Sequence, residues 1–335
     1  MIYSAGIIGL GKYLPERIVT NRELEELVDT SDEWITTRTG ISERRIAAAE
    51  QATSDLAIAA AQEALLDARL GADELDLIIV ATISPDMIFP ATACLVQAAL
   101  GATKAAAFDL SAGCSGYVYA LITAAQFIAA GLYQNVLVVG ADTLSRLTDW
   151  QDRRTCVLFG DGAAAAVVGR VPDGYGILGS LLGADGTGGN HLYLPAGGSR
   201  RPASPETLEN REHYIKMSGP EVFKFAVKVM EEATLQVIEQ AGLTLADIDL
   251  FVPHQANIRI IDSSLHRMGV PHERVFLNVD KYGNTSAASV GIALAEAVAA
   301  GRVHDGDNIL LVGFGAGLTW GSAVLKWYDR RQLNG

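Results

Sequence analysis

The sequence contains little that would point to a disulfide framework, a membrane or a nucleic acid. Its three cysteines, Cys94, Cys114 and Cys156, stand in unlike contexts that suggest neither disulfide pairing nor metal ligation. No apolar run approaches the roughly 20 residues that span a bilayer, and no basic leader precedes the short apolar stretch at the start. The net charge of −13, without a basic run to offset it, argues against nucleic-acid binding. We therefore expect a cytoplasmic protein without a metal site.

Hydrophobic residues are abundant, at 49% of 335, and they recur in a pattern that indicates an internal duplication. Two pairs of segments align at an offset of 173 residues, and a third pair aligns at 170. The pairs are "QEALLDARLGADELDLIIVAT" (62–82) with "LQVIEQAGLTLADIDLFVPHQ" (235–255), "QNVLVVGADTL" (134–144) with "DNILLVGFGAG" (307–317), and "GCSGYVYALITAAQFIAAG" (113–131) with "GNTSAASVGIALAEAVAAG" (283–301). Three ordered matches at nearly constant offset favour duplication over chance.

Each half alternates predicted strands with predicted helices, which is typical of a mainly parallel sheet covered on both faces. The fold class is therefore α/β, with two βαβαβ halves. The Gly- and Pro-containing segment "GRVPDGYG" (169–176) places the boundary so that the halves are residues 1–173 and 174–335. The irregular stretch 183–213 is predicted to be a long functional or surface loop.

The segment "DLSAGCSGYVYAL" (109–121) places Cys114 between a predicted buried strand and a predicted buried helix. Backbone N–H groups at a helix start lack helical partners, and the helix dipole is positive there. Such a site should lower the pKa of the thiol and favour the nucleophilic thiolate. The alternative is a small buried hydrophobic residue, which is the role we expect for Cys94 and Cys156.

Three further features could act with Cys114. His254 ends a predicted parallel strand, where α/β folds place ligands, although it could simply cap the next helix. Asn284 aligns with Cys114 in the repeat, although it could be an N-cap. The glycine-rich turn "GFGAG" (313–317) could supply N–H groups to an oxyanion hole. Together they fit a Cys-His-Asn hydrolase or an acyltransferase acting on thioesters, and a binding protein without catalysis is the third possibility.

Seven ordered motifs decide among these classes by resemblance. They are "DTSDEWITTRTGI" (29–41), "FPATAC" (89–94), "DLSAGCSGY" (109–117), "VLFGDGAAAA" (157–166), "VPHQANIRI" (252–260), "GNTSAAS" (283–289) and "GFGAGLTWGSA" (313–323). With these motifs the chain resembles thiolase-fold condensing enzymes, and closely the β-ketoacyl-acyl-carrier-protein synthase III family. A degradative thiolase would need a second cysteine near the last motif, and a chain-elongating synthase would need a histidine in place of Asn284.

The resemblance implies a thiolase-like fold with a five-layered αβαβα core and an acyltransferase that needs no cofactor. It implies that an acyl-CoA acylates Cys114 and that malonyl-acyl carrier protein then condenses with the acyl group, starting fatty acid synthesis. His254 and Asn284 would stabilise the enolate, and an N–H of the loop Gly315, Ala316 and Gly317 would complete the oxyanion hole. A related enzyme of secondary metabolism with an unusual primer would keep the same residues.

The resemblance also implies binding roles outside the catalytic residues. The residues expected at the CoA adenine and phosphates are Trp34, Arg38 and Arg153, and those expected to dock the carrier protein are Lys224, Arg259 and Arg267. His266 stands where the family can carry a lysine, which weakens that patch.

Phe89 resembles a residue that enters the acyl pocket of a partner subunit, so a homodimer is expected. The primer is not fixed by the sequence, because pocket depth depends on Phe89, Met87 and the loop 183–213. Ala316 stands where the family often has glycine, and a positive φ there would strain alanine.

Overall fold

The computed structural model describes residues 3–330 and contains two large sheets. The first has the strand order β1-β7-β6-β4-β5, with bounds β1 (Ala5–Tyr13), β4 (Leu77–Ala81), β5 (Ala106–Leu110), β6 (Asn135–Asp142) and β7 (Gly162–Arg170). The second has the order β11-β12-β13-β8, with bounds β8 (Gly176–Ala184), β11 (Leu250–Pro253), β12 (Asn308–Gly315) and β13 (Thr319–Lys326). Strands β4, β5 and β6 run parallel, as do β11 and β12.

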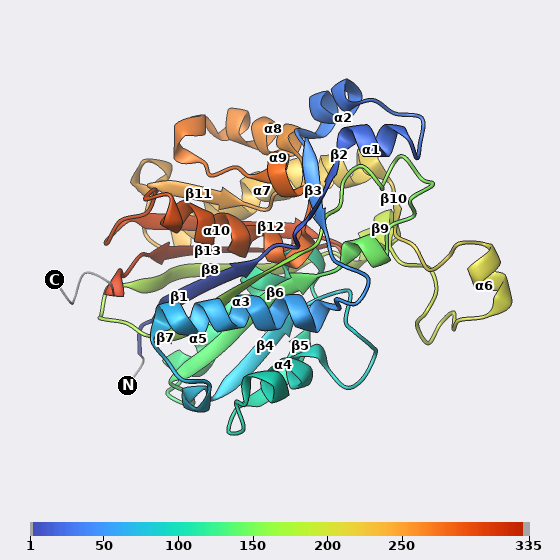
Figure 1. Cartoon of the computed structure of the whole chain (residues 1–335). Coiled ribbons are helices and arrows are strands. Elements are labelled where there is room, and N and C mark those ends of the chain that lie inside the picture. The colour runs from blue at the N-terminus through green and yellow to red at the C-terminus, as the bar shows by residue number, and fades with distance from the viewer. Residues whose placement is uncertain (1–2, 331–335) are drawn as a thin grey trace.

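Helices cover both sheets and fill the space between them, so the fold has five layers (Figure 1). Helices α3 (Thr53–Ala68) and α4 (Thr92–Leu100) pack on the outer face of the first sheet. Helices α5 (Gly116–Ala129) and α10 (Ser289–Ala299) lie between the sheets, and α7 (Gly219–Gln240) and α8 (Ile258–Met268) cover the second. The central helices are apolar on all sides because both of their faces meet a sheet. The predicted α/β fold with an αβαβα core is confirmed.

Smaller elements lie at the upper side of the molecule in Figure 1 or in connections. They are β2 (Arg17–Thr20), α1 (Asn21–Glu25), α2 (Asp32–Thr39), β3 (Glu43–Ile46), β9 (Leu192–Tyr193), α6 (Pro205–Glu209), β10 (Lys216–Met217) and α9 (Val279–Tyr282). The stretch 183–213 contains the end of β8, then β9 and α6, and the part around α6 stands away from the body (Figure 1). The chain passes from the first sheet at Arg170 to the second at Gly176, on either side of the expected boundary.

The repeat is visible in the structure, with one change of register. Strands β4 and β11 begin 173 residues apart, and so do β6 and β12. The turns before α5 and α10, Gly113–Ser115 and Ser286–Ala288, keep this offset, whereas the two helices end only 170 residues apart. The predicted equivalence of Cys114 and Asn284 is therefore wrong. Cys114 corresponds to Ala287, because α10 is three residues shorter than α5.

Two predictions of burial are also wrong. Strand β5 is half-exposed, because it forms the edge of its sheet. Cys94 is exposed on α4, whereas Cys156 is buried as predicted. In the described part of the chain, no helix has both the length and the apolar character needed to cross a membrane.

Candidate active site

Three side chains from three separate segments meet at one cavity of about 280 Å³. Cys114 lies in the turn between β5 and α5, and His254 directly follows β11. Asn284 lies between α9 and the turn before α10. The ends of parallel strands and the starts of the central helices thus bring both halves of the chain to one place.

The backbone at the end of β12 lies against Cys114. A Cβ placed on Gly315 would lie 2.8 Å from the Cβ of Cys114 and 3.0 Å from its Sγ, closer than carbon atoms tolerate. The next residue, Ala316, lies equally close to Gly113 across the same contact. Glycine at position 315 therefore allows the strand end, with its N–H groups, to approach the thiol.

The loop after β12 accommodates alanine without the strain expected from the sequence. The positive φ of this loop, 140°, falls on Gly317 and not on Ala316. The Thr319 hydroxyl lies 2.8 Å from the carbonyl oxygen of Ala112 and 2.9 Å from that of Ala316. These contacts join the loop to the turn that carries Cys114.

Burial dominates the protonation of Cys114. Its side chain is 6% exposed, and loss of hydration raises the pKa of the thiol to about 12. The Ser286 hydroxyl lowers the pKa of the thiol, but less than burial raises it. The prediction of a lowered pKa is therefore wrong, because the thiol lies deeper than a helix terminus at a surface.

His254 is held as a neutral ring. It is 1% exposed, and burial lowers the pKa of its imidazole to about 3. The Ser289 hydroxyl lies 2.5 Å from Nδ1, and the Phe314 ring packs edge-on with the ring centroids 5.2 Å apart. When Ser289 donates to Nδ1, the ring proton resides on Nε2, which can then donate to a ligand.

The backbone on both sides fixes Asn284. Its N–H donates to the Leu158 carbonyl at 2.8 Å, and its carbonyl accepts from the Gly160 N–H at 3.1 Å. The Ser286 N–H donates to Oδ1 at 2.8 Å. Since the side-chain oxygen is occupied, the amide NH₂ is the group that can donate to a ligand.

Asp142, at the end of β6, was not identified from the sequence. Its carboxylate is fully buried and accepts hydrogen bonds from Thr82, Ser84 and the Ala287 N–H, and burial raises its pKa. It therefore ties the loop after β4 to the start of α10. The signal that could have found it is an acidic residue ending the apolar run "NVLVVGAD" (135–142).

The three residues expected to bind CoA lie together. The Ser31 hydroxyl caps α2 by accepting from the Trp34 N–H at 3.1 Å. The guanidinium carbons of Arg38 and Arg153 lie 5.1 and 4.6 Å from the centre of the Trp34 ring. Trp34 and Arg38 line the cavity of Cys114, whereas Arg153 lies beyond its rim, over the indole.

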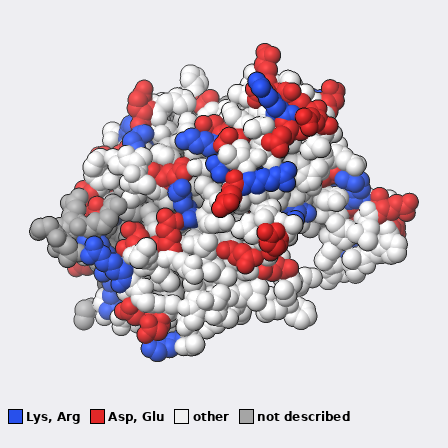
Figure 2. Space-filling model, in the orientation of Figure 1, with Lys and Arg blue, Asp and Glu red and all other residues white. Residues whose placement is uncertain are grey.

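The residues expected to dock the carrier protein are exposed on two packed helices. Lys224 lies on α7, and Arg259 and Arg267 lie on α8. Arg259 reaches the cavity, and Arg267 pairs with Glu231 at 2.6 Å, which offsets part of its charge. On the face shown in Figure 2, acidic and basic side chains are interspersed.

Phe89 lies apart from Cys114 within one chain. Its ring is 83% exposed, and neither it nor Met87 lines the cavities that contain Cys114. A second cavity, of about 170 Å³, adjoins Cys114 instead. Beside Cys114 it is lined by Ile83, Leu144, Leu147, Phe159, Leu192, Tyr193, Leu194, Ile215, Ser286 and Ala316. Of the loop 183–213, residues 192–194 contribute to it.

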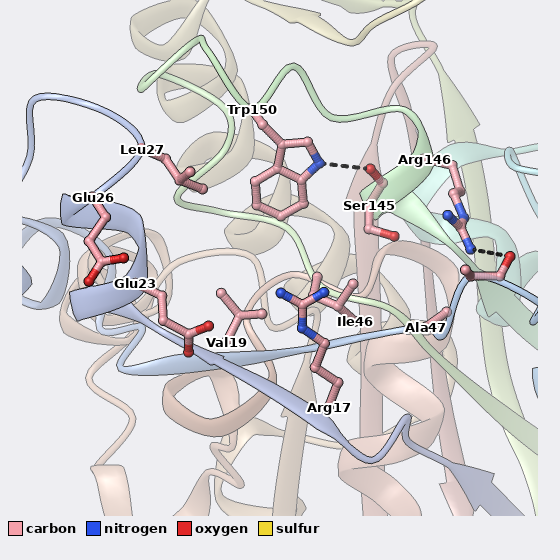
Figure 3. Close-up of a pocket in the computed structure, with 11 residues that line it drawn as sticks. Arg17, Val19, Glu23, Glu26, Leu27, Ile46, Ala47, Ser145, Arg146 and Trp150 are labelled. Carbon is pink, nitrogen blue, oxygen red and sulfur yellow. Dashed lines mark hydrogen bonds between the residues drawn. The ribbon is translucent and has the colours of Figure 1, made fainter.

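A larger cavity, of about 510 Å³, contains none of the candidate catalytic residues (Figure 3). Its polar groups serve the fold, since Arg146 donates to the Ala48 carbonyl at 2.7 Å and the Trp150 indole donates to the Ser145 carbonyl at 3.2 Å. Among residues 3–330, no group of three or more His, Cys, Asp or Glu side chains is placed to hold a metal ion.

Comparisons with known proteins give the family. The profile of the 3-oxoacyl-[acyl-carrier-protein] synthase III family matches residues 108–186, and that of its C-terminal part matches residues 238–327. A β-ketoacyl-[acyl-carrier-protein] synthase III from Caldanaerobacter subterraneus subsp. tengcongensis is 64% identical over 97% of this chain and 98% of its own. The chain belongs to this family.

Solved structures of synthase III enzymes have the same fold. The Thermus thermophilus synthase III is 55% identical, with a TM-score of 0.90 over 97% of this chain and 99% of its own. The priming β-ketosynthase of the R1128 polyketide pathway is 38% identical, with a TM-score of 0.90 over 98% and 97%. The chain is therefore an acyltransferase of the initiating condensing type, and the hydrolase and non-catalytic alternatives are not favoured.

Proposed function

We propose that this synthase III family member joins an acyl group from acyl-CoA to a malonyl group on acyl carrier protein, with Cys114 carrying the acyl group between the two steps. The observation that carries the proposal is the arrangement around Cys114. A buried thiol lies against a strand end at Gly315, and the neutral ring of His254 and the amide of Asn284 line the same cavity. A nucleophile and two uncharged donors suit thioester chemistry.

In the first step, Cys114 Sγ bonds to the carbonyl carbon of the acyl-CoA. The N–H of Cys114 and an N–H of the loop 315–317 hold the oxyanion. The carbon–sulfur bond to CoA then breaks, and the thiol proton leaves with CoA. Because burial raises the pKa of Cys114, the proton stays on sulfur until substrate arrives.

In the second step, His254 and Asn284 donate hydrogen bonds to the thioester oxygen of the malonyl group. The bond to the carboxylate breaks, CO₂ leaves, and its electron pair forms the enolate that these donors stabilise. The enolate carbon then bonds to the acyl carbonyl, the bond to Cys114 breaks, and the sulfur takes up a proton. Ser289 supports this step by keeping the ring proton of His254 on Nε2.

The same proposal assigns the binding residues. Trp34 and Arg153 flank the adenine of CoA, which requires Arg153 to move from the indole face it now covers, and Arg38 contacts the phosphates. Carrier protein is acidic, and the residues proposed to dock it are Lys224, Arg259 and Arg267. Residues 1–173 form the half that carries the nucleophile, and residues 174–335 form the half that carries the two donors.

A homodimer is part of the proposal. Phe89 and its neighbours Met87 and Ile88 expose apolar side chains, at 83%, 48% and 81%, close to the free edge of β5. Such a surface suits contact with a second copy, whose acyl pocket would receive Phe89. The chemistry needs no cofactor, since thiol, imidazole and amide carry it, and a cytoplasmic location stays a prediction.

The test is the intact mass of the protein after incubation with acyl-CoA, beside a Cys114→Ala variant. The proposal predicts one acyl adduct on the wild type and none on the variant. No adduct from any thioester would overturn it.

A further inference from the structure

Cys114 stands between two cavities of different character. The cavity of about 280 Å³ contains Trp34 and Arg38 and faces the proposed CoA site. The second cavity, of about 170 Å³, lies beside Cys114 without these residues. A thioester bound in the first would therefore direct its acyl group into the second.

The second cavity is suited to hydrocarbon. Its walls are mostly branched aliphatic side chains, and none of the described residues that line it carries a charge. Its polar groups are Cys114 and the hydroxyls of Tyr193 and Ser286. A primer with a second carboxylate would lose hydration there without a partner, so charged primers are disfavoured.

The volume sets the length of the primer. An engineered cavity of about 150 Å³ lined by Leu, Ile and Phe stays dry and binds benzene, which has six carbons. Space of 170 Å³ therefore holds about four to six carbon atoms. We infer that the preferred primer is an uncharged aliphatic acyl group of about this size, and not acetyl or a long chain.

The inference rests on the proposed function and adds the class of primer. Acetyl would leave most of the cavity empty, and each added methylene that fits should favour acylation about fourfold. The exposed part of the lining is Tyr193 and Leu194, at 43% and 40%. In the proposed homodimer this is where Phe89 of the partner subunit would close the cavity, so the test uses the whole protein.

The experiment is a competition for Cys114 among equimolar acetyl-, butyryl-, isovaleryl-, hexanoyl- and decanoyl-CoA, read by intact mass at early times. We expect the adducts with four to six carbons to form roughly tenfold faster than those of acetyl and decanoyl. Fastest acylation by acetyl or decanoyl would overturn the inference and leave the proposed function standing. Absence of every adduct would instead overturn the proposed function.

Leu147 allows the cavity to be altered from a half-buried position. Leu147→Phe fills space and should lower the butyryl-to-acetyl ratio about tenfold, whereas Leu147→Ala should raise the hexanoyl-to-butyryl ratio. Leu132→Phe, at a 63% exposed position in the turn before β6, is the control and should change neither ratio. Unchanged ratios in both Leu147 variants would show that this cavity does not receive the primer.

Discussion

The two buried groups at the centre of the site are both held neutral by loss of hydration. Burial raises the pKa of Cys114 to about 12 and lowers the pKa of His254 to about 3. The free site therefore contains a thiol and a neutral imidazole instead of a thiolate–imidazolium pair. This protonation suits a site that accepts two different thioesters in turn, because His254 remains a hydrogen-bond donor throughout.

The protonation of Cys114 predicts the pH dependence of its alkylation. Below a pKa of about 12 the thiolate fraction rises tenfold with each pH unit, so alkylation by iodoacetamide should accelerate about 100-fold from pH 7 to 9. Mass spectrometry gives the rate, and Cys114→Ala corrects for the exposed Cys94. A plateau below pH 9 would restore the lowered pKa expected from the sequence.

Ser289 should act as a positioning residue through His254. In Ser289→Ala, decarboxylation of malonyl-carrier protein should slow about tenfold, the cost of one hydrogen bond, while acylation is unchanged. Ser289→Thr, which keeps a hydroxyl, should restore the rate. Nitrogen NMR of the imidazole should show the ring proton on Nε2 in the wild type. Equal slowing of both steps, or a proton on Nδ1, would contradict this role.

At the scale of elements, the site depends on how closely the end of β12 approaches the turn that carries Cys114. Gly315→Ala would place a Cβ within 3.0 Å of Sγ, so acylation should fall about 100-fold or more while the fold persists. Gly186→Ala is the matched control, since a Cβ there meets nothing within 4 Å. Acyl adducts and melting curves measure both variants. Acylation of Gly315→Ala at the wild-type rate would argue against this contact.

Strand and helix order could be predicted from the sequence, because alternation and repeat mark each element. The position of His254 at the end of β11 followed directly from its apolar run. The three-residue difference between α5 and α10 could not be predicted, since it lies in a short turn with no periodicity. The exposure of β5 and Cys94 could not be predicted either, because a strand's place at a sheet edge depends on distant pairing. For the same reason the depth of Cys114 escaped prediction.

For the whole molecule, the site lies where the two halves meet, and an exposed apolar surface lies beside the edge of the first sheet. Phe89→Asp should convert a dimer, with twice the mass of the chain, into a monomer, because it places a charge in the proposed contact. Light scattering after size exclusion measures the mass. Leu132→Asp, at an exposed site by the opposite ends of the parallel strands, should leave the dimer intact. A monomeric wild type would contradict the proposed homodimer.

The central claim is that Cys114 carries the acyl group while His254 and Asn284 act on the malonyl group. Its most direct test is Asn284→Ala measured in the two steps separately, as acyl adduct on Cys114 and as CO₂ released from malonyl-carrier protein. The account predicts an acylation rate like that of the wild type and CO₂ release slower by about 100-fold, the cost of one lost donor. Equal loss in both steps would contradict the division of roles.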